Sequence, residues 1–214
     1  KWNLINNNFI VTSGSGINFE KFKNSHYNVN NDIIKFIMIS RLIKDKGIFE
    51  FINAAKLIKE EFSDNVEFKL VGDADVENYS SINSKDLIEL QKNNIIKHYN
   101  FSNNVIEHIL DSHCLILPSY REGASKIIME AQALRRPIIT TDVPGCNDLV
   151  IDGFNGFTCK VKDHNDLYLK LKKFINLSKD EKIIMSTNAY NYSINNFDEK
   201  QVINEYMQLI NIYE

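Results

Sequence analysis

The chain of 214 residues carries 28 acidic and 25 basic side chains, which gives a net charge of −3. The two signs are mixed along the chain, so the composition lacks the basic surface typical of nucleic-acid-binding proteins and we expect no nucleic-acid partner. With 43% hydrophobic residues, the chain can bury a sizeable core within one principal domain. No apolar run reaches the roughly 20 residues that a membrane-spanning helix needs.

Three cysteines, Cys114, Cys146 and Cys159, have no spacing typical of metal ligands. We expect them to be small buried residues of a protein in a reducing, cytoplasmic compartment. The start of the chain at Lys1 has no signal-peptide pattern and no initiating methionine. We therefore expect the sequence to be a piece of a longer protein.

Apolar runs and helical periodicities alternate along the chain. A short strand over 9–11 precedes an asparagine-rich linker over 23–32. The sequence then predicts strands over 33–39, 66–71, 95–99, 113–117 and 137–140, with one more short strand after 154–157. It predicts helices over 47–60, 84–92, 103–110, 124–134, 164–177, 179–191 and 198–213. This alternation predicts an α/β fold with a doubly wound parallel sheet, similar to a Rossmann fold.

Two glutamates, Glu122 and Glu130, stand with seven residues between them, after one predicted strand and before the next. This order places Glu122 in a loop at the carboxyl end of a strand and Glu130 about two turns into a helix. Both then face the crevice where open α/β sheets bind ligands. Carboxylates accept hydrogen bonds from sugar hydroxyls, and the free amides near 124–126 can bind phosphate. The pattern favours a phosphorylated sugar, although a solvent-facing Glu130 would fit it too.

Cations follow the first strand of the domain. Arg41 leaves the carboxyl end of that strand, and Lys46 precedes Gly47 at the start of the next helix. Both would lie at the same edge of the sheet as the Glu122 loop. A guanidinium fork and a mobile ammonium together suit a diphosphate. The simpler interpretation is that Lys46 is an ordinary loop lysine.

Gly72 and Tyr99 end the second and third strands. A glycine lets a ligand approach the backbone closely, although a plain turn explains Gly72 equally well. Tyr99 offers an aromatic face to a nucleotide base, but packing of Tyr99 and Phe101 in the core is an equal alternative. The histidines have no carboxylate or serine at a telling spacing, and a turn cap explains Asp142, so we assign these residues no role.

Taken together, these stretches resemble the carboxyl-terminal half of family 4 retaining glycosyltransferases, which have the GT-B fold. The resemblance covers about residues 12–214. It is carried by Ser40-Arg41-Leu42 with Lys46-Gly47, Val71-Gly72-Asp73, Leu117-Pro118-Ser119 with Glu122-Gly123 and Glu130-Ala131, residues 137–142, and Asp152-Gly153-Phe154-Asn155-Gly156. Residues 13–18, 117–123 and 143–146 are similar to stretches in enzymes of bacterial capsule, O-antigen and glycan assembly, and this is the group that the chain resembles most.

The resemblance implies that this half binds a nucleotide-sugar donor, with UDP as the carrier and a hexose or an N-acetylhexosamine as the sugar. It places Arg41 and Lys46 on the diphosphate, Glu122 on the transferred sugar and Glu130 on the ribose hydroxyls. The backbone amides of Gly123, Ala124, Ser125 and Lys126 would meet the phosphate and sugar. Members of the family stabilise the leaving diphosphate without a metal, so the resemblance implies no metal and no cofactor apart from the donor.

The same resemblance divides the chain into an interdomain strand and linker over 1–32, a nucleotide-sugar-binding domain over 33–194 and a carboxyl-terminal crossover helix over 195–214. It implies a missing amino-terminal domain that holds a lipid-linked or glycan acceptor, with the complete enzyme at the inner face of the membrane. We therefore expect the isolated chain to bind donor weakly and to transfer nothing. The helix should leave apolar residues partly exposed, namely Val202, Tyr206, Leu209 and Ile210.

The chain departs from the family at three positions. Asn100 stands where related sequences usually have glycine, which puts the base contact there in doubt. Lys126 and Asn147 stand where close relatives often have arginine, which bears on the choice of sugar or acceptor.

Two alternatives remain open from the sequence. One is another GT-B activity, such as a nucleotide-sugar 2-epimerase or a phosphorylase, whose catalytic groups would lie in the missing half. The other is a doubly wound module that binds a partner or phosphate without catalysis, as a receiver-like domain does. Receiver domains need an acidic cluster after the first strand, where this chain has Arg41.

Overall fold

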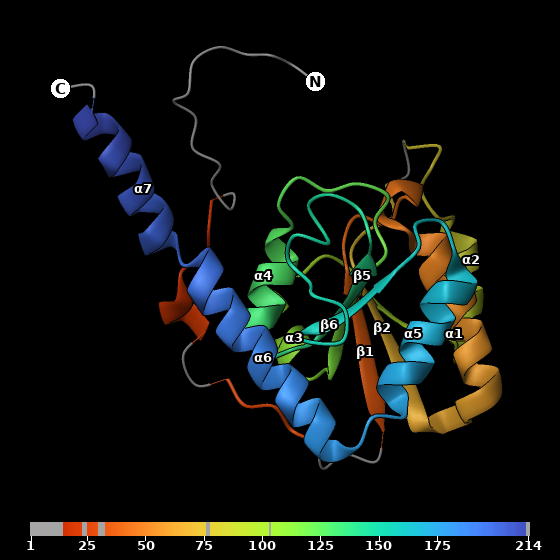
Figure 1. The fold of residues 1–214 in the computed structure, drawn as a ribbon. Helices are drawn as coiled ribbons and strands as arrows, with labels where there is room; N and C mark the ends of the chain where they lie inside the picture. The colour runs from red at the N-terminus through yellow and green to blue at the C-terminus, as the bar shows by residue number, and fades with distance from the viewer. Residues whose placement is uncertain (1–14, 23–24, 30–32, 76–77, 103, 213–214) are drawn as a thin grey trace.

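The computed structural model describes residues 15–22, 25–29, 33–75, 78–102 and 104–212. Its strands are β1 (Ile34–Ile39), β2 (Val66–Val71), β3 (Lys97–Tyr99), β4 (Cys114–Leu117), β5 (Ile138–Thr141) and β6 (Gly156–Cys159). All pair in parallel, in the order β3-β2-β1-β4-β5-β6 (Figure 1). The order runs outward in both directions from the β1–β4 pair, so the predicted doubly wound fold is confirmed.

Helices cover both faces of this sheet (Figure 1). They are α1 (Ile48–Phe62), α2 (Ser84–Lys92), α3 (Val105–Leu110), α4 (Lys126–Ala133), α5 (His164–Ile175), α6 (Lys179–Phe197) and α7 (Glu199–Ile212). Short 3-10 turns stand at η1 (Phe19–Phe22), η2 (Lys44–Lys46) and η3 (Ser63–Asn65). No helix in the described part of the chain is long and apolar enough to cross a membrane.

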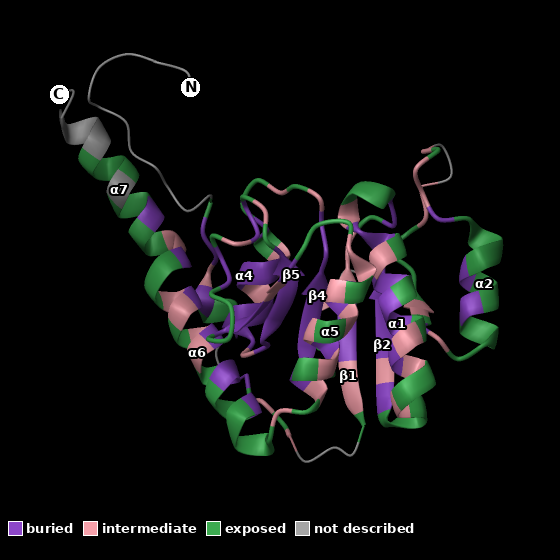
Figure 2. Ribbon diagram, turned by 45° about the vertical axis from the view of Figure 1, so that its right-hand side comes forward, coloured by how far each residue is buried: buried purple, intermediate pink, exposed green. Residues whose placement is uncertain are grey.

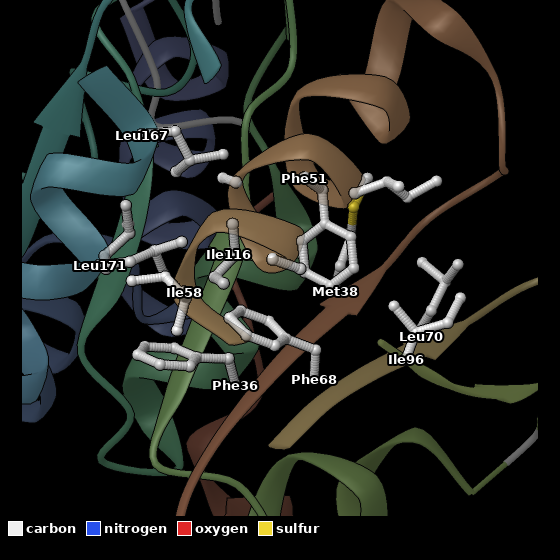
Figure 3. Packing of buried hydrophobic residues seen from close by; sticks show 14 of the residues in the cluster. Phe36, Met38, Phe51, Ile58, Phe68, Leu70, Ile96, Ile116, Leu167 and Leu171 are labelled. Carbon is white, nitrogen blue, oxygen red and sulfur yellow. The ribbon is translucent and has the colours of Figure 1, made fainter. Parts of the chain in front are cut away.

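Alternating residues of β1 separate the core into two layers. Phe36 and Met38 point to the face covered by α1, α2 and α5, where Phe36 stacks on Phe68 with ring centroids 5.3 Å apart (Figure 3). Ile37 points to the opposite face, with residues of α3, α4 and α6. Each of these three β1 side chains is fully buried. A parallel sheet covered on both faces requires such continuous apolar strands, which explains why their apolar runs were legible in the sequence.

Two helix boundaries differ from the sequence prediction. Helix α4 begins at Lys126 rather than at 124, because Ser125 has an extended backbone and occupies the cap position. Helix α6 runs on to Phe197 instead of ending at 191. The asparagines near its end have low helix propensity, but Ser193 and Phe197 are buried, and packing of this kind overrides propensity. The predicted strand over 9–11 lies outside the described residues.

The described parts of residues 15–29 pack on the domain. Ile17 is buried and bridges to Asp198, where α6 passes into α7. Ser25 is buried and its hydroxyl donates to the carbonyl oxygen of Ala133. Beyond the junction at Asp198, α7 extends away from the rest of the molecule (Figure 2). The described parts of residues 15–29 therefore connect the end of α6 to the rest of the domain.

Helix α7 exposes only part of the apolar surface that the sequence suggested. Tyr206 is exposed, as are Ile203 and Met207. Val202, by contrast, is buried, because it lies in the first turn of α7 next to the Ile17 bridge. The side chains at 209 and 210 lie outside the described residues.

Arg136 is a charged side chain inside the domain, at the amino-terminal side of the sheet. It is 2% exposed and donates to the carbonyl oxygens of Ile109, Leu110, Leu134 and His26. Burial lowers the pKa of its guanidinium to about 10, so it stays charged at neutral pH. Helix ends leave carbonyl oxygens without partners inside the helix, and Arg136 supplies donors to the ends of α3 and α4.

Candidate functional site

The loops that follow β1 and β4 meet at the carboxyl edge of the sheet. Gly47 is the cap residue that precedes α1. Its backbone is left-handed (φ 75°), and a Cβ there would lie 2.1 Å from the carbonyl oxygen of Pro118. Only glycine fits so close an approach. Because β1 and β4 are the strands where the sheet reverses its winding, this contact lies at the switch point where open α/β sheets bind ligands.

Lys46 and Glu122 form an ion pair at this meeting point. The ammonium of Lys46 lies 2.7 Å from Oε1 of Glu122, and Ser119 donates a hydrogen bond of 2.8 Å to the same oxygen. The two charged side chains are 22% and 12% exposed, so water screens the pair less than a surface pair. Ser119 is fully buried and its carbonyl oxygen accepts from Thr141. Glu122 is therefore held from two sides.

Gly145 supports the backbone of the Glu122 loop from behind. Its backbone is left-handed (φ 80°), and a Cβ at this position would lie 2.1 Å from the carbonyl oxygen of Gly123 and 2.4 Å from that of Glu122. The Gly145 amide donates to Asp148, 2.8 Å away, which fixes the turn. The sequence marked this turn but not its contact, because residues some 20 positions apart meet here through the fold alone.

The start of α4 is open towards the crevice. A Cβ added at Gly123 would meet nothing within 4 Å, and Gly123, Ala124 and Lys126 are all exposed. The amide groups from Gly123 to Ser125 precede the first helical residue, so they lie in a loop at a helix amino terminus. Such a terminus favours bound anions.

Glu130 lies on the second turn of α4 with a side chain that is 25% exposed. Burial raises the pKa of its carboxyl group, while the charge of Lys126 opposes that rise from 4.0 Å away. No hydrogen bond to this carboxylate is present within the described ranges. The carboxylate is therefore only partly solvated, and it can accept a hydrogen bond from a ligand hydroxyl.

A hollow of about 480 Å³ lies at the ends of β1 and β2 beside Arg41. Arg41 is exposed, and no described residue forms an ion pair with it. Gly72 and Phe101 also line the hollow. A Cβ at Gly72 would lie 2.0 Å from the carbonyl oxygen of Ser40, so the backbone of the first loop alone already requires this glycine.

Neither Tyr99, the last residue of β3, nor Phe101 packs in the core, so the alternative of core packing is wrong. Phe101 is 70% exposed and Tyr99 is 38% exposed. The Tyr99 ring lies beside His108 on α3, with centroids 5.0 Å apart, and Phe101 rather than Tyr99 lines the hollow. The reason is the position of β3 at the edge of the sheet, where its residues have a neighbouring strand on one side only.

The described part of the molecule has three further features. A larger groove of about 640 Å³ lies between α1 and α2, and its lining includes none of the predicted site residues. Within the described ranges, no three histidine, cysteine, aspartate or glutamate side chains gather in a group that could hold a metal ion. The cysteines are free and buried, as expected, and burial raises the pKa of Cys146 beneath the site.

The cations Arg41 and Lys46, two carboxylates and an open helix terminus thus lie at one edge of a doubly wound sheet. The family model for glycosyl transferases group 1 matches residues 19–192. The chain belongs to this family. The match confirms the resemblance drawn from the motifs.

Similar proteins come from several bacteria. The chain is 33% identical over 174 residues to the capsular polysaccharide biosynthesis glycosyltransferase CapM of Staphylococcus aureus, covering 77% of this chain and 44% of CapM. It is 27% identical over 219 residues to the N,N'-diacetylbacillosaminyl-diphospho-undecaprenol alpha-1,3-N-acetylgalactosaminyltransferase of Campylobacter jejuni, covering 96% and 55%. The chain thus spans about half the length of these curated relatives.

The fold is also that of solved glycosyltransferase structures. The crystal structure of Anabaena HepE in complex with UDP superimposes with a TM-score of 0.78 at 18% identity, covering 92% of this chain and 56% of HepE. At this level of identity the superposition shows the fold alone. The fold of this chain is that of a GT-B glycosyltransferase domain.

Proposed function

We propose that this chain is the donor-binding half of a retaining glycosyltransferase that uses a UDP-linked hexose or N-acetylhexosamine. The observation that carries the proposal is the Lys46–Glu122 pair beside the open backbone of Gly123. This arrangement places a cation and a carboxylate next to exposed backbone amides, and those are groups that bind a sugar diphosphate.

The leaving diphosphate is the first partner of the site. Arg41 supplies a planar fork and Lys46 a point charge, while the α4 amino terminus supplies amide donors. Stabilisation of charge that develops on the leaving group is among the largest contributions to catalysis. These residues supply it from the protein itself, and the proposed mechanism is independent of a metal.

The two carboxylates recognise the rest of the donor. Glu122 orients the transferred sugar, because Lys46 and Ser119 hold Oε1 and leave Oε2 for a hydroxyl. Glu130 accepts hydrogen bonds from the ribose hydroxyls, since its half-buried carboxylate has no described hydrogen-bond donor. In this mechanism the acceptor attacks the same face that the diphosphate leaves, and a diphosphate oxygen takes the acceptor's proton. No protein nucleophile is then needed.

The relatives support a class of donor and a class of acceptor. HepE was crystallised with UDP and with UDP-glucose, and the Campylobacter jejuni relative is named for N-acetylgalactosamine transfer to a diphospho-undecaprenol-linked sugar. We therefore propose UDP as the carrier and a lipid-linked or glycan acceptor in the synthesis of a bacterial surface polysaccharide or glycan. The acceptor would bind an amino-terminal domain of the same enzyme, at the inner face of the membrane.

Thermal unfolding of this chain with a panel of ligands tests the proposal. A ligand that binds only the folded state raises the melting temperature, and the rise grows with the ratio of ligand concentration to dissociation constant. We expect millimolar UDP to raise it more than GDP or ADP, and inorganic phosphate to leave it unchanged. Equal shifts with UDP and phosphate would instead support a module that binds phosphate without recognising a nucleotide.

A further inference from the structure

Tyr120 joins three loops at the carboxyl edge of the sheet. Its hydroxyl donates to Oε1 of Glu50 in the first turn of α1, at 2.7 Å, and its amide donates to the carbonyl oxygen of Asp45 in η2, at 2.9 Å. The ammonium of Lys162, in the turn between β6 and α5, lies 4.9 Å from the centre of its ring. Its own backbone belongs to the loop after β4.

These contacts stand on either side of the Lys46–Glu122 pair. Asp45 precedes Lys46 in the chain, and Glu122 follows two residues after Tyr120. Each half of the ion pair is thus anchored to the other loop within two residues. The nearby Arg121–Asp45 pair at 3.6 Å adds little, because both side chains are exposed and water screens them.

Glu50 has no part in the proposed chemistry. Burying a carboxylate destabilises the folded state unless the carboxylate is paired, so its partner is of interest. Its Oε2 is buried and has no hydrogen-bond partner among the described residues, so the Tyr120 hydroxyl is its described donor. The amino terminus of α1 favours the negative charge in its first turn. Burial, followed by the hydrogen bond to Glu50 and then the charge of Glu50, raises the pKa of Tyr120, so the phenol keeps the proton that it donates.

We propose that Tyr120 is a positioning residue of the donor site, which sets the distance between the Lys46 loop and the Glu122 loop through Glu50 and Asp45. The proposal rests on the proposed function. Tyr120 acts through Lys46 and Glu122 and does not itself contact the donor.

Two tyrosine variants of this chain test the proposal by calorimetric titration with UDP. Tyr120→Phe removes the hydroxyl and keeps the ring. We expect it to weaken UDP binding about tenfold, the equivalent of one hydrogen bond to a charged group. The matched control is Tyr168→Phe. It removes a hydroxyl that donates to Glu61, which lies on α1 like Glu50 but near the other end of that helix. We expect UDP to bind this control as it binds the wild type.

Glu50 variants separate positioning from a general loss of stability. Glu50→Gln keeps an oxygen acceptor for the Tyr120 hydroxyl and should retain most of the UDP affinity. Glu50→Ala should weaken binding as much as Tyr120→Phe, and the double variant should be no weaker than either, because both changes break one interaction. Additive losses in the double variant would contradict a shared positioning role.

A measurement without nucleotide distinguishes failure of this inference from failure of the proposed function. In amide nitrogen NMR spectra of the free chain, Tyr120→Phe should move the Lys46 and Glu122 signals, and Tyr168→Phe should not. If the wild type binds UDP and Tyr120→Phe binds it equally well, the positioning role is overturned and the donor site stands. If the wild type binds no UDP, the donor function fails, and unmoved NMR signals would overturn the positioning role as well.

Discussion

The Lys46 ammonium lies 2.7 Å from Glu122 Oε1, although 76 positions separate the two residues in the chain. In the proposed donor site these groups serve different parts of the ligand, Lys46 the diphosphate and Glu122 the sugar. A diphosphate that binds Lys46 must therefore compete with a carboxylate already in contact with it.

This competition predicts opposite effects for the two halves of the pair. Lys46→Met should weaken UDP binding by about 2 kcal/mol, because it removes a charge-assisted contact to the diphosphate. Glu122→Gln should bind UDP at least as tightly as the wild type, since Lys46 is released, but should lose the extra affinity that the sugar of a UDP-sugar supplies. Calorimetry with UDP and UDP-glucose compares the two variants. Lys97→Ala, which breaks the remote pair with Glu67, serves as the control and should change neither affinity.

Gly145 and Gly153 form a matched pair of left-handed glycines, with φ of 80° and 79°. A Cβ at Gly145 would collide with the carbonyl oxygens of Gly123 and Glu122, whereas at Gly153 it would meet nothing within 4 Å. Gly153→Ala should therefore cost only the backbone strain, about 1 kcal/mol. Gly145→Ala should cost more in urea unfolding and should also weaken UDP binding, because the Glu122 loop must shift. Equal losses of stability in Gly145→Ala and Gly153→Ala would mean that the Glu122 loop shifts at no cost in free energy.

Gly123 tests whether a ligand comes close to the backbone of the Glu122 loop. An added methyl group meets open space in the free chain, so Gly123→Ala should leave the urea midpoint within the error of the wild type. If the donor lies against the amides of this loop, the same methyl group occupies its place, and UDP-sugar affinity should fall about tenfold or more. Unchanged affinity in a stable Gly123→Ala variant would place the donor elsewhere.

His113 makes the stability of the domain depend on pH. Its side chain is 5% exposed, and its Nδ1 accepts a hydrogen bond from the amide of Lys35. Burial, reinforced by the charges of Arg136, Lys35 and Lys182 and opposed by Asp111, lowers its pKa from 6.5 to about 4. The unfolded chain takes up this proton below pH 6.5 and the folded chain only near pH 4. The contribution of His113 to the free energy of unfolding is therefore complete above pH 6.5 and is lost as the pH falls through 4. The loss amounts to at most about 3 kcal/mol.

Urea unfolding between pH 7 and 4 measures this dependence. His113→Asn keeps an acceptor for the Lys35 amide but has no proton to bind, so its stability should fall less steeply between pH 6.5 and 4 than that of the wild type. Parallel curves for the two proteins would show that His113 does not cause the loss.

The parallel sheet and its alternating helices could be predicted, because strands buried on both faces consist of consecutive apolar residues. The proximity of Lys46 to Glu122 could be expected for a related reason: the carboxyl ends of parallel strands share one edge of the sheet. The continuation of α6 from residue 191 to Phe197 could not be predicted, because its last turns depend on burial of Ser193 and Phe197 rather than on local propensity.

The supporting contacts of the site were not legible in the sequence. Tyr120 and Glu50 are 70 positions apart, and nothing in either residue's neighbours indicates the partner. Gly145 reads as an ordinary turn until the fold brings it under Gly123. The exposure of Tyr99 and Phe101 depends on the place of β3 at the edge of the sheet, and strand order is a property of the whole chain.

Calorimetric titration of this chain with UDP, beside Arg41→Ala and Glu130→Ala, is the decisive measurement of donor binding. We expect UDP to bind the wild type weakly and both variants to lose most of this binding, because one removes a diphosphate contact and the other a ribose contact. No UDP binding to the folded wild type at millimolar concentration would rule out a donor site at these residues, and so would binding that neither variant reduces.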